Sequence, residues 1–146
     1  MTKIDIASQV QILMNQFNAK NFDVVIICAG YVLNQQAINK KNINRKILDH
    51  IKINKNIIDA CKMNKIHKVI YLSSALGYPS SKFKLTENIF FKGKVPKRHL
   101  FVGNMYRSLE KYLYKSLLNF IILRPGEVYG EYDNFKINSA NSIAKY

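Results

Sequence analysis

Three short apolar runs, each followed by small or turn-forming residues, limit what this chain can fold into more than any other feature. The runs are FDVVIICAG at 22–30, KVIYLSS at 68–74 and FIIL at 120–123. Continuous apolar runs of this length are typical of parallel strands that are buried on both faces. They are too short to cross a bilayer, and the polar N-terminus MTKIDIASQVQ lacks the apolar stretch of a signal peptide. We therefore expect a cytoplasmic protein without a membrane span.

Helical periodicity separates these runs. The stretch ILDHIKINKNIIDACKM repeats apolar residues at helical spacing, which predicts an amphipathic helix over 49–63. After a loop with Pro79 and Pro96, a second helix is predicted over 103–118, and a further one is expected over 8–17. The order strand, helix, strand, helix, strand predicts an α/β fold with a parallel sheet and right-handed crossovers. A chain of 146 residues is long enough for one such domain with its own core.

The carboxyl ends of parallel strands are where sheets of this kind bind their ligands. In this sequence the ends are Ala29-Gly30, Ser73-Ser74 and Arg124-Pro125-Gly126. Each pair or triplet by itself is also explained as a strand-to-loop turn, which small residues and proline favour. Because the three ends would lie together on neighbouring strands, we expect a binding site along this edge of the sheet.

The formal net charge of +14 calls for an anionic partner. Lysine supplies most of it, since the arginines are only Arg45, Arg98, Arg107 and Arg124. Lysine, asparagine and isoleucine are abundant together, as in proteins from AT-rich genomes whatever their function. Along the sequence the basic residues are scattered and do not form a recognised nucleic-acid motif with aromatic residues. We therefore expect a solvated basic surface, which suits an anionic small ligand such as a nucleotide better than nucleic acid.

Cysteine and histidine usage argues against disulfides and metal. Cys28 and Cys61 lie beside apolar residues in predicted regular elements, which predicts two reduced, buried thiols of a cytosolic protein. His50, His67 and His99 lack the spacing of metal ligands. No metal site is predicted.

Five motifs, in order along the chain, resemble the NAD(P)-dependent epimerase/dehydratase family of the extended short-chain dehydrogenase type. DVVIICAG resembles a strand that ends in two small residues against the cofactor. NIIDACKMNKIHKVIYLSS resembles a helix and the strand that carries a catalytic serine or threonine, and SSALGYP the loop after it. LRPGEVYG resembles the motif after the sixth strand, and YGEYDNFKINSANSIAKY is similar to the corresponding segment of GDP-L-fucose synthases.

This resemblance implies a Rossmann-like parallel sheet with flanking helices, NAD or NADP as cofactor and a nucleotide sugar as substrate. The positions that it places against the cofactor are Ala29, Gly30, Ser73, Arg124 and Pro125. Helices like those predicted over 49–63 and 103–118 pair across dimer interfaces in the family, so that a homodimer is expected. The choice between NAD and NADP stays open.

Departures from the family pattern matter as much. The family holds the dinucleotide pyrophosphate on a glycine-rich turn, whereas none of the six glycines here forms a GxxGxxG cluster. We therefore expect residues 1–146 to form a single, incomplete domain that lacks the N-terminal glycine-rich unit and the C-terminal substrate domain. The sequence predicts a fragment or degraded form of such an enzyme. The alternative is a non-catalytic remnant of the fold that serves as a binding or assembly module.

The stretch HLFVGNMYRSLEKY, at 99–112, lies where the family carries a catalytic tyrosine and a lysine four residues later. A glutamate commonly follows that lysine by four residues, and alignment on Glu110 places Tyr106 at the lysine position and Val102 at the tyrosine position. Neither member of the pair is then kept. Alternatively, Tyr106 is the acid/base and Lys111 supplies the positive charge, although one residue along a helix is a rotation of about 100°.

Ser74 is the candidate catalytic serine by the same resemblance, and it would hold a substrate oxygen by a hydrogen bond. Its simpler role is to satisfy the end of the strand, and the simpler role of Tyr106, Tyr112 and Tyr114 is packing on a helix that covers the sheet. Without the family's first β-α-β unit, we expect weak NADPH binding. We also expect an exposed apolar face or edge at the strand over 22–28.

Overall fold

The computed structural model describes residues 22–31, 43–82, 84–128 and 130–131. The described strands and α-helices are β1 (Val24–Ile27), α3 (Ile43–Met63), β2 (Lys68–Leu72), α4 (Leu100–Tyr114) and β3 (Phe120–Leu123). Three short 3-10 helices, η2 (Ala75–Gly77), η3 (Glu87–Ile89) and η4 (Lys97–His99), connect β2 to α4. The helix expected over 8–17 lies outside the described residues.

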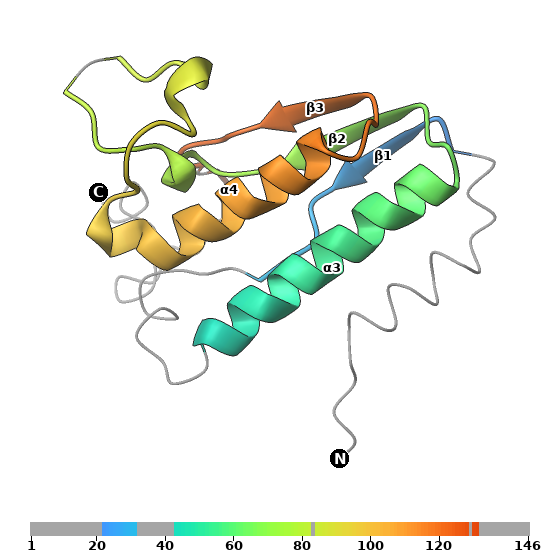
Figure 1. Ribbon diagram of the computed structural model, residues 1–146, viewed down its shortest axis with the longest axis horizontal. Coiled ribbons are helices and arrows are strands. Elements are labelled where there is room, and N and C mark those ends of the chain that lie inside the picture. Colours follow the sequence, from blue (N-terminus) through green and yellow to red (C-terminus); the bar gives the residue numbers. More distant parts are fainter. Residues whose placement is uncertain (1–21, 32–42, 83, 129, 132–146) are drawn as a thin grey trace.

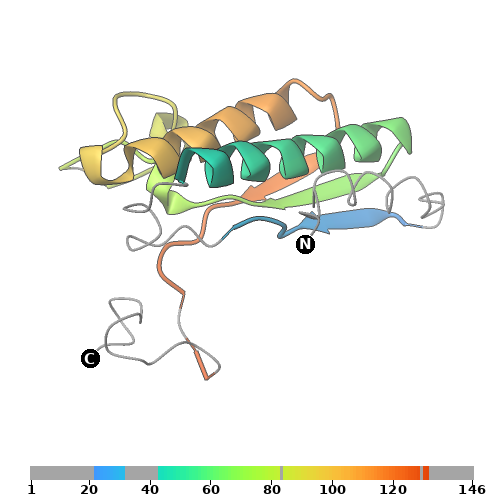
Figure 2. The ribbon, with the colours of Figure 1, turned by 90° about the horizontal axis from the view of Figure 1, so that it is seen from below.

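The described strands form one parallel sheet in the order β1-β2-β3. Val24 is paired with Lys68, and Val69 with Phe120. The helices α3 and α4 lie side by side (Figure 1), and Figure 2 shows both of them on the same face of the sheet. The predicted alternation of parallel strands and helices is thus confirmed for the described part of the chain.

The core lies between this pair of helices and the sheet. Residues on one face of each helix are buried at helical spacing, and they meet the inward-facing residues of the strands. The members with at most 2% exposure include Ile58, Cys61, Met105, Leu109, Leu113, Ile27, Val69 and Tyr71. Burial of each large apolar side chain contributes about 1.5–3 kcal/mol relative to leaving it in water. This layer therefore holds the described elements together.

The opposite face of the sheet carries exposed apolar side chains. Successive strand residues point to opposite faces, so that Ile27 is buried under α3 whereas Ile26 is 62% exposed. The other large apolar side chains exposed on the strands are Val24, Leu72, Ile121 and Leu123. This confirms the expected exposed apolar face at the first strand. The predicted burial of Cys28 was wrong, because Cys28 alternates with Ile27 and is exposed, whereas Cys61 is buried as predicted.

The element boundaries differ from those predicted. Helix α3 begins at Ile43 rather than at residue 49, and α4 runs over Leu100–Tyr114 rather than 103–118. After α4 the Ser116 hydroxyl donates to the Leu113 carbonyl oxygen at 2.6 Å, and Leu117 takes a left-handed φ of 61°. These two features turn the chain out of the helix. None of the described helices is long and apolar enough to serve as a membrane span.

The loop between β2 and α4 is fixed on α4 by Arg107. Its Nε donates to the Gly77 carbonyl oxygen at 2.7 Å, and its Nη1 donates to the Gly93 carbonyl oxygen at 2.9 Å. Phe90 is fully buried and packs so closely on Gly77 that a Cβ there would overlap its ring. The loop is therefore held in place although it contains little regular structure.

Candidate functional site

The carboxyl ends of β2 and β3 are joined by backbone hydrogen bonds that continue past the strands. The Ser73 amide donates to the Leu123 carbonyl oxygen at 2.8 Å, and the Ala75 amide donates to the Pro125 carbonyl oxygen at 3.0 Å. Since β1 is paired with β2 in parallel, the three predicted strand ends lie along one edge of the sheet. That part of the prediction is confirmed.

A fully buried carboxylate, Glu110 of α4, organises this edge. The Ser73 hydroxyl donates to its Oε1 at 2.5 Å. Arg124 donates from Nε to Oε1 at 2.9 Å and from Nη2 to Oε2 at 2.8 Å. Three donors therefore surround the carboxylate, which is the condition under which a charge can be buried without a large penalty.

Arg124 has two further partners in this network. Its Nη1 donates to the Tyr78 hydroxyl at 3.3 Å, and its guanidinium carbon lies 3.9 Å from the centroid of the Phe90 ring. Burial by itself would lower the pKa of Arg124, but the hydrogen bonds to Glu110 and Tyr78 outweigh burial and raise this pKa. The side chains of Ser73 and Arg124 are thus directed at Glu110, within the protein.

A second polar cluster lies where β1 meets α3. His50 is 4% exposed, and its Nδ1 accepts a hydrogen bond from the Tyr31 amide at 3.1 Å. A Cβ at Gly30 would overlap the His50 imidazole, and the Ala29 carbonyl oxygen accepts from Asn54 Nδ2 at 3.0 Å. A glycine at position 30 is therefore required by α3 itself, and α3 also binds the backbone of Ala29.

The second cluster is neutral and incompletely hydrogen-bonded. Burial lowers the pKa of His50 to about 4, so that its imidazole is uncharged at neutral pH. The Tyr71 hydroxyl and Asn54 Oδ1 are buried without a hydrogen-bond partner in the described part of the chain. Burial, followed by the nearby Tyr106 and Glu110, raises the pKa of Tyr71.

The structure does not bring the two candidate dyad residues together. The ring of Tyr106 packs edge-on against His50, with centroids 5.7 Å apart, and burial raises its pKa. Lys111 is exposed, and its Nζ lies 5.7 Å from the centroid of the Phe91 ring. Val102, the other residue in the alignment, is buried in the core. In the described part of the chain, neither Lys111 nor another ammonium contributes to the pKa of Tyr106, whereas the family's tyrosine requires such a neighbour.

Ser74 caps a short helix. Its Oγ accepts a hydrogen bond from the Leu76 amide at 3.2 Å, at the start of η2. This is the strand-end role that the sequence also allowed.

The described residues do not fit a dinucleotide by themselves. A pyrophosphate needs several unpaired backbone amides at a glycine-rich turn or helix N-terminus. Of the predicted contacts, Ser73 and Arg124 are engaged by Glu110, Ala29 by Asn54, and Gly30 by His50. Pro125 has no amide N–H to offer. Among the described residues there is also no group of three or more side chains that could hold a metal ion.

Sequence reasoning missed His50, Asn54 and Tyr71 as members of this edge. A signal was available for two of them. His50 and Asn54 are polar residues four apart that share the helix face of Ile57 and Cys61, which the sequence already marks as buried. Tyr71 gave no signal, because tyrosine is common in strands.

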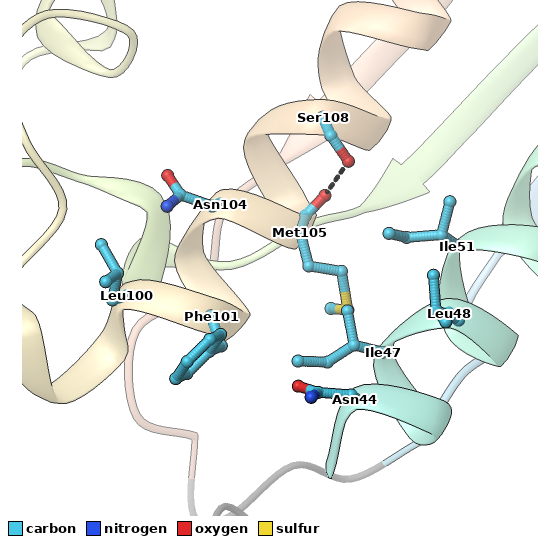
Figure 3. Close-up of a pocket in the computed structure, with 9 residues that line it drawn as sticks. All are labelled: Asn44, Ile47, Leu48, Ile51, Leu100, Phe101, Asn104, Met105 and Ser108. Carbon is cyan, nitrogen blue, oxygen red and sulfur yellow. Dashed lines mark hydrogen bonds between the residues drawn. The ribbon is translucent and has the colours of Figure 1, made fainter.

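The outer surface of the helix pair has an apolar hollow of about 460 Å³ between α3 and α4. Figure 3 shows Ile47, Leu48 and Ile51 lining it from α3, opposite Phe101 and Met105 from α4. Its rim is polar, with Asn44, Asn104 and Ser108. None of Ser73, Glu110 and Arg124 lines the hollow.

Comparisons with known proteins agree on one fold. The profile of the family described as "NAD dependent epimerase/dehydratase family" matches residues 1–146. No curated protein matches the sequence.

One similar solved structure is a GDP-D-glycero-L-gluco-heptose synthase from Campylobacter jejuni, studied with NADPH. Its TM-score is 0.77 and its sequence identity is 22%, and the match covers 95% of this chain and 42% of that one. A GDP-L-fucose synthetase from Naegleria fowleri bound to NADP has a TM-score of 0.75 and a sequence identity of 20%. That match covers 94% of this chain and 46% of the other. The Bordetella bronchiseptica enzyme WbmH in complex with NAD+ has a TM-score of 0.62 and a sequence identity of 18%. That match covers 83% of this chain and 38% of the other. This chain thus spans less than half the length of each, and the likeness shows a partial Rossmann-like α/β fold.

Proposed function

Because this chain belongs to the NAD-dependent epimerase/dehydratase family, we propose that it is the central portion of a nucleotide-sugar epimerase, dehydratase or reductase, without catalytic activity of its own. Support for the substrate class comes from the similar structures, whose names include a GDP-heptose synthase and a GDP-L-fucose synthetase. The segment from Gly130 onward, with its Asp133-Asn134-Phe135 motif, resembles the GDP-L-fucose synthases in sequence.

The environment of Tyr106 is the observation that supports the proposed lack of catalytic activity. Proton exchange at a substrate hydroxyl needs a phenol with a lowered pKa, beside a cation. Here burial raises the pKa of Tyr106, its aromatic neighbour His50 is neutral, and Lys111 lies by Phe91. NAD or NADP would supply the hydride in the family's chemistry, but the described residues offer no complete site for either.

An NADPH titration of the 146-residue chain, followed by the fluorescence of the nicotinamide, tests this proposal. We expect no saturation, with a Kd weaker than about 100 μM. The variants Tyr106→Phe and Lys111→Ala should leave the titration unchanged, which serves as the control. A low-micromolar Kd of the wild-type chain would contradict the proposal.

The apolar hollow between α3 and α4 favours a second role, as an assembly surface for two copies of the chain. Leu48 is 65% exposed and Phe101 is 56% exposed on either side of the hollow. Pairing of two copies through these helices would remove both side chains from water. From the sequence we expect a homodimer through helices over 49–63 and 103–118, and the hollow lies on the same two helices, partly before those ranges. Such a dimer does not require catalytic activity.

Sedimentation velocity tests the dimer. We expect a concentration-dependent dimer that the double variant Leu48→Glu/Phe101→Glu converts to monomer. Leu117→Glu is the matched control, because Leu117 is 90% exposed after the end of α4, away from the hollow. A wild-type chain that stays monomeric at all concentrations would rule out this role.

A further inference from the structure

Five aromatic rings form a continuous row along the side of α4 that faces away from α3. Successive ring centroids lie 4.9 Å apart from Tyr78 to Phe90, 5.0 Å to Phe91, 6.0 Å to Tyr114 and 5.0 Å to Phe120. Phe90 is fully buried, whereas Phe91 is 36% exposed and Tyr114 is 51% exposed. The row is therefore anchored in the protein and opens to solvent at two rings.

One exposed lysine lies against these rings, and three more are their near neighbours in the sequence. Lys111 Nζ lies 5.7 Å from the Phe91 ring centroid, Lys92 and Lys94 follow Phe91 in the chain, and Lys115 follows Tyr114. We call this set the basic–aromatic patch: Phe91, Lys92, Lys94, Lys111, Tyr114 and Lys115.

Few negative charges offset the patch. The described residues of the segment 82–98 include six basic side chains and a single acidic one, Glu87. Glu110, the acid of α4, is fully buried and paired with Arg124. On α3, by contrast, acidic side chains lie among the basic ones. Asp49 Oδ2 lies 3.9 Å from Arg45 Nε, and Asp59 accepts a hydrogen bond from the Tyr112 hydroxyl. Positive charge and exposed aromatic rings thus coincide at the patch, with few nearby acids among the described residues.

The patch is held in shape before any partner arrives. Arg107 donates to the Gly93 carbonyl oxygen between the two loop lysines, and Val95 is buried just after them. Lys111, Tyr114 and Lys115 lie on or next to the last turns of α4. A preformed surface loses less conformational entropy on binding than a flexible loop does.

The six residues of the patch differ from those of the Glu110 network, which are Ser73, Glu110 and Arg124. Tyr114 ends α4 and packs on Phe120, the first residue of β3, whereas Ser73 and Arg124 lie beyond the carboxyl ends of the strands. Figure 1 shows the loop that carries Lys92 and Lys94 on the opposite side of α4 from α3. The patch connects to the Glu110 network through the buried ring of Phe90, which packs on Phe91 and lies 3.9 Å from the guanidinium carbon of Arg124.

From this geometry we propose that the basic–aromatic patch binds single-stranded nucleic acid. Lysines neutralise phosphates, and exposed aromatic rings stack on unpaired bases, which is the combination that sequence-tolerant single-strand binders use. A duplex fits the patch less well, because its bases are already stacked on one another. The sequence did not predict this role, since residues 91–94 and 111–115 come together only in the fold.

Fluorescence anisotropy of the full chain with a labelled oligouridylate of about twelve nucleotides tests the proposal. Between about 50 and about 200 mM salt, binding should weaken steeply as counterions are released. The triple variant Lys92→Ala/Lys94→Ala/Lys111→Ala should bind at least about tenfold more weakly, with a salt slope smaller by about 2. Tyr114→Leu, which keeps the apolar bulk on Phe120, should weaken binding about fivefold or more and leave the slope unchanged.

The matched control is Lys46→Ala/Lys62→Ala, which removes positive charge from α3 and should change the affinity less than about threefold. Equal losses in the control and in the triple variant would mean that the overall charge binds the oligonucleotide, and would overturn the proposal. Three further results would also overturn it: no binding at low salt, equal affinity for the matching duplex, and binding to anionic phospholipid vesicles in place of the oligonucleotide.

Discussion

The two buried polar clusters at the carboxyl edge of the sheet differ in charge and in how completely their polar atoms are hydrogen-bonded. Around Glu110 the groups are charged, and every oxygen of the carboxylate has a donor from Ser73 or Arg124. Around His50 the groups are neutral, and Asn54 keeps a buried polar atom without a partner in the described residues. The Tyr71 hydroxyl, which lies near Tyr106 and Glu110, is also buried without a partner there.

The difference shows which cluster stabilises the fold. A satisfied buried ion pair becomes very costly when one partner is lost, whereas an unpaired hydroxyl costs free energy while it is present. We therefore expect substitutions in the Glu110 network to destabilise the protein, and some in the His50 cluster to be neutral or stabilising. The predictions below test that contrast.

The largest effect is expected for Glu110→Gln. The variant leaves the Arg124 guanidinium, whose side chain is 10% exposed, without its carboxylate. The free energy of unfolding, from urea denaturation at neutral pH, should fall by about 3 kcal/mol. Glu87→Gln, at an exposed acid of the loop, is the control and should change stability by less than about 0.5 kcal/mol. Equal effects of the two variants would mean that the network contributes little.

A pH-dependent loss of stability comes next, and it involves His50. The folded protein holds the pKa of this imidazole at about 4, below the usual 6.5, so that the unfolded chain binds more protons between these values. The contribution of neutral His50 to the free energy of unfolding is therefore fully present above about pH 6.5. It is lost as the pH falls toward 4, by roughly 2–3 kcal/mol. His50→Gln should flatten the urea-midpoint profile over this window. An unchanged slope would show that other groups cause it.

Ser73→Ala should have a moderate effect. It removes the hydroxyl that donates to Glu110 at 2.5 Å, and leaves one oxygen of the carboxylate with Arg124 alone. A hydrogen bond to a charged group contributes about 1.5–3 kcal/mol, and we expect a loss near the lower value. Urea denaturation measures it, and a stabilised variant would contradict the assignment of this hydroxyl.

Tyr71→Phe is the matching change at the other buried hydroxyl, and its effect should be the smallest. It also removes one buried hydroxyl, but this one has no partner among the described residues. We expect a change between zero and a gain of about 1 kcal/mol in the free energy of unfolding. A loss as large as that of Ser73→Ala would show that the Tyr71 hydroxyl is hydrogen-bonded in solution.

Sequence patterns predicted the strands and helices of this molecule better than the polar contacts at the carboxyl edge of its sheet. Apolar runs gave the three parallel strands, with β3 at Phe120–Leu123 as predicted, and helical periodicity gave α3 and α4. The end of α4 was misplaced because Ser116 and Leu117 form a local turn that periodicity does not show. The burial of Cys28 was misjudged because a continuous apolar run does not reveal that one face of the sheet is exposed.

The candidate site was harder to predict because its contacts join residues far apart in the sequence. Ser73, Glu110 and Arg124 were all noticed, but nothing in the sequence shows that the first and last bind the second. The one-residue offset between Tyr106 and Lys111 was the useful signal, since it anticipated that the two side chains lie apart. Whether Ser74 or Tyr106 ever contacts a substrate stays a prediction.

The ionisation of Tyr106 tests the central claim most directly, because the family's chemistry depends on a phenol with a lowered pKa. Tyrosine-specific ¹³C labelling with NMR, and the Tyr106→Phe variant to assign the signal, gives the titration of this one hydroxyl. The account predicts that Tyr106 ionises at a higher pH than an ordinary tyrosine, since its burial raises the pKa. Ionisation near pH 7 would contradict it, and would mean that a working acid/base remains on α4.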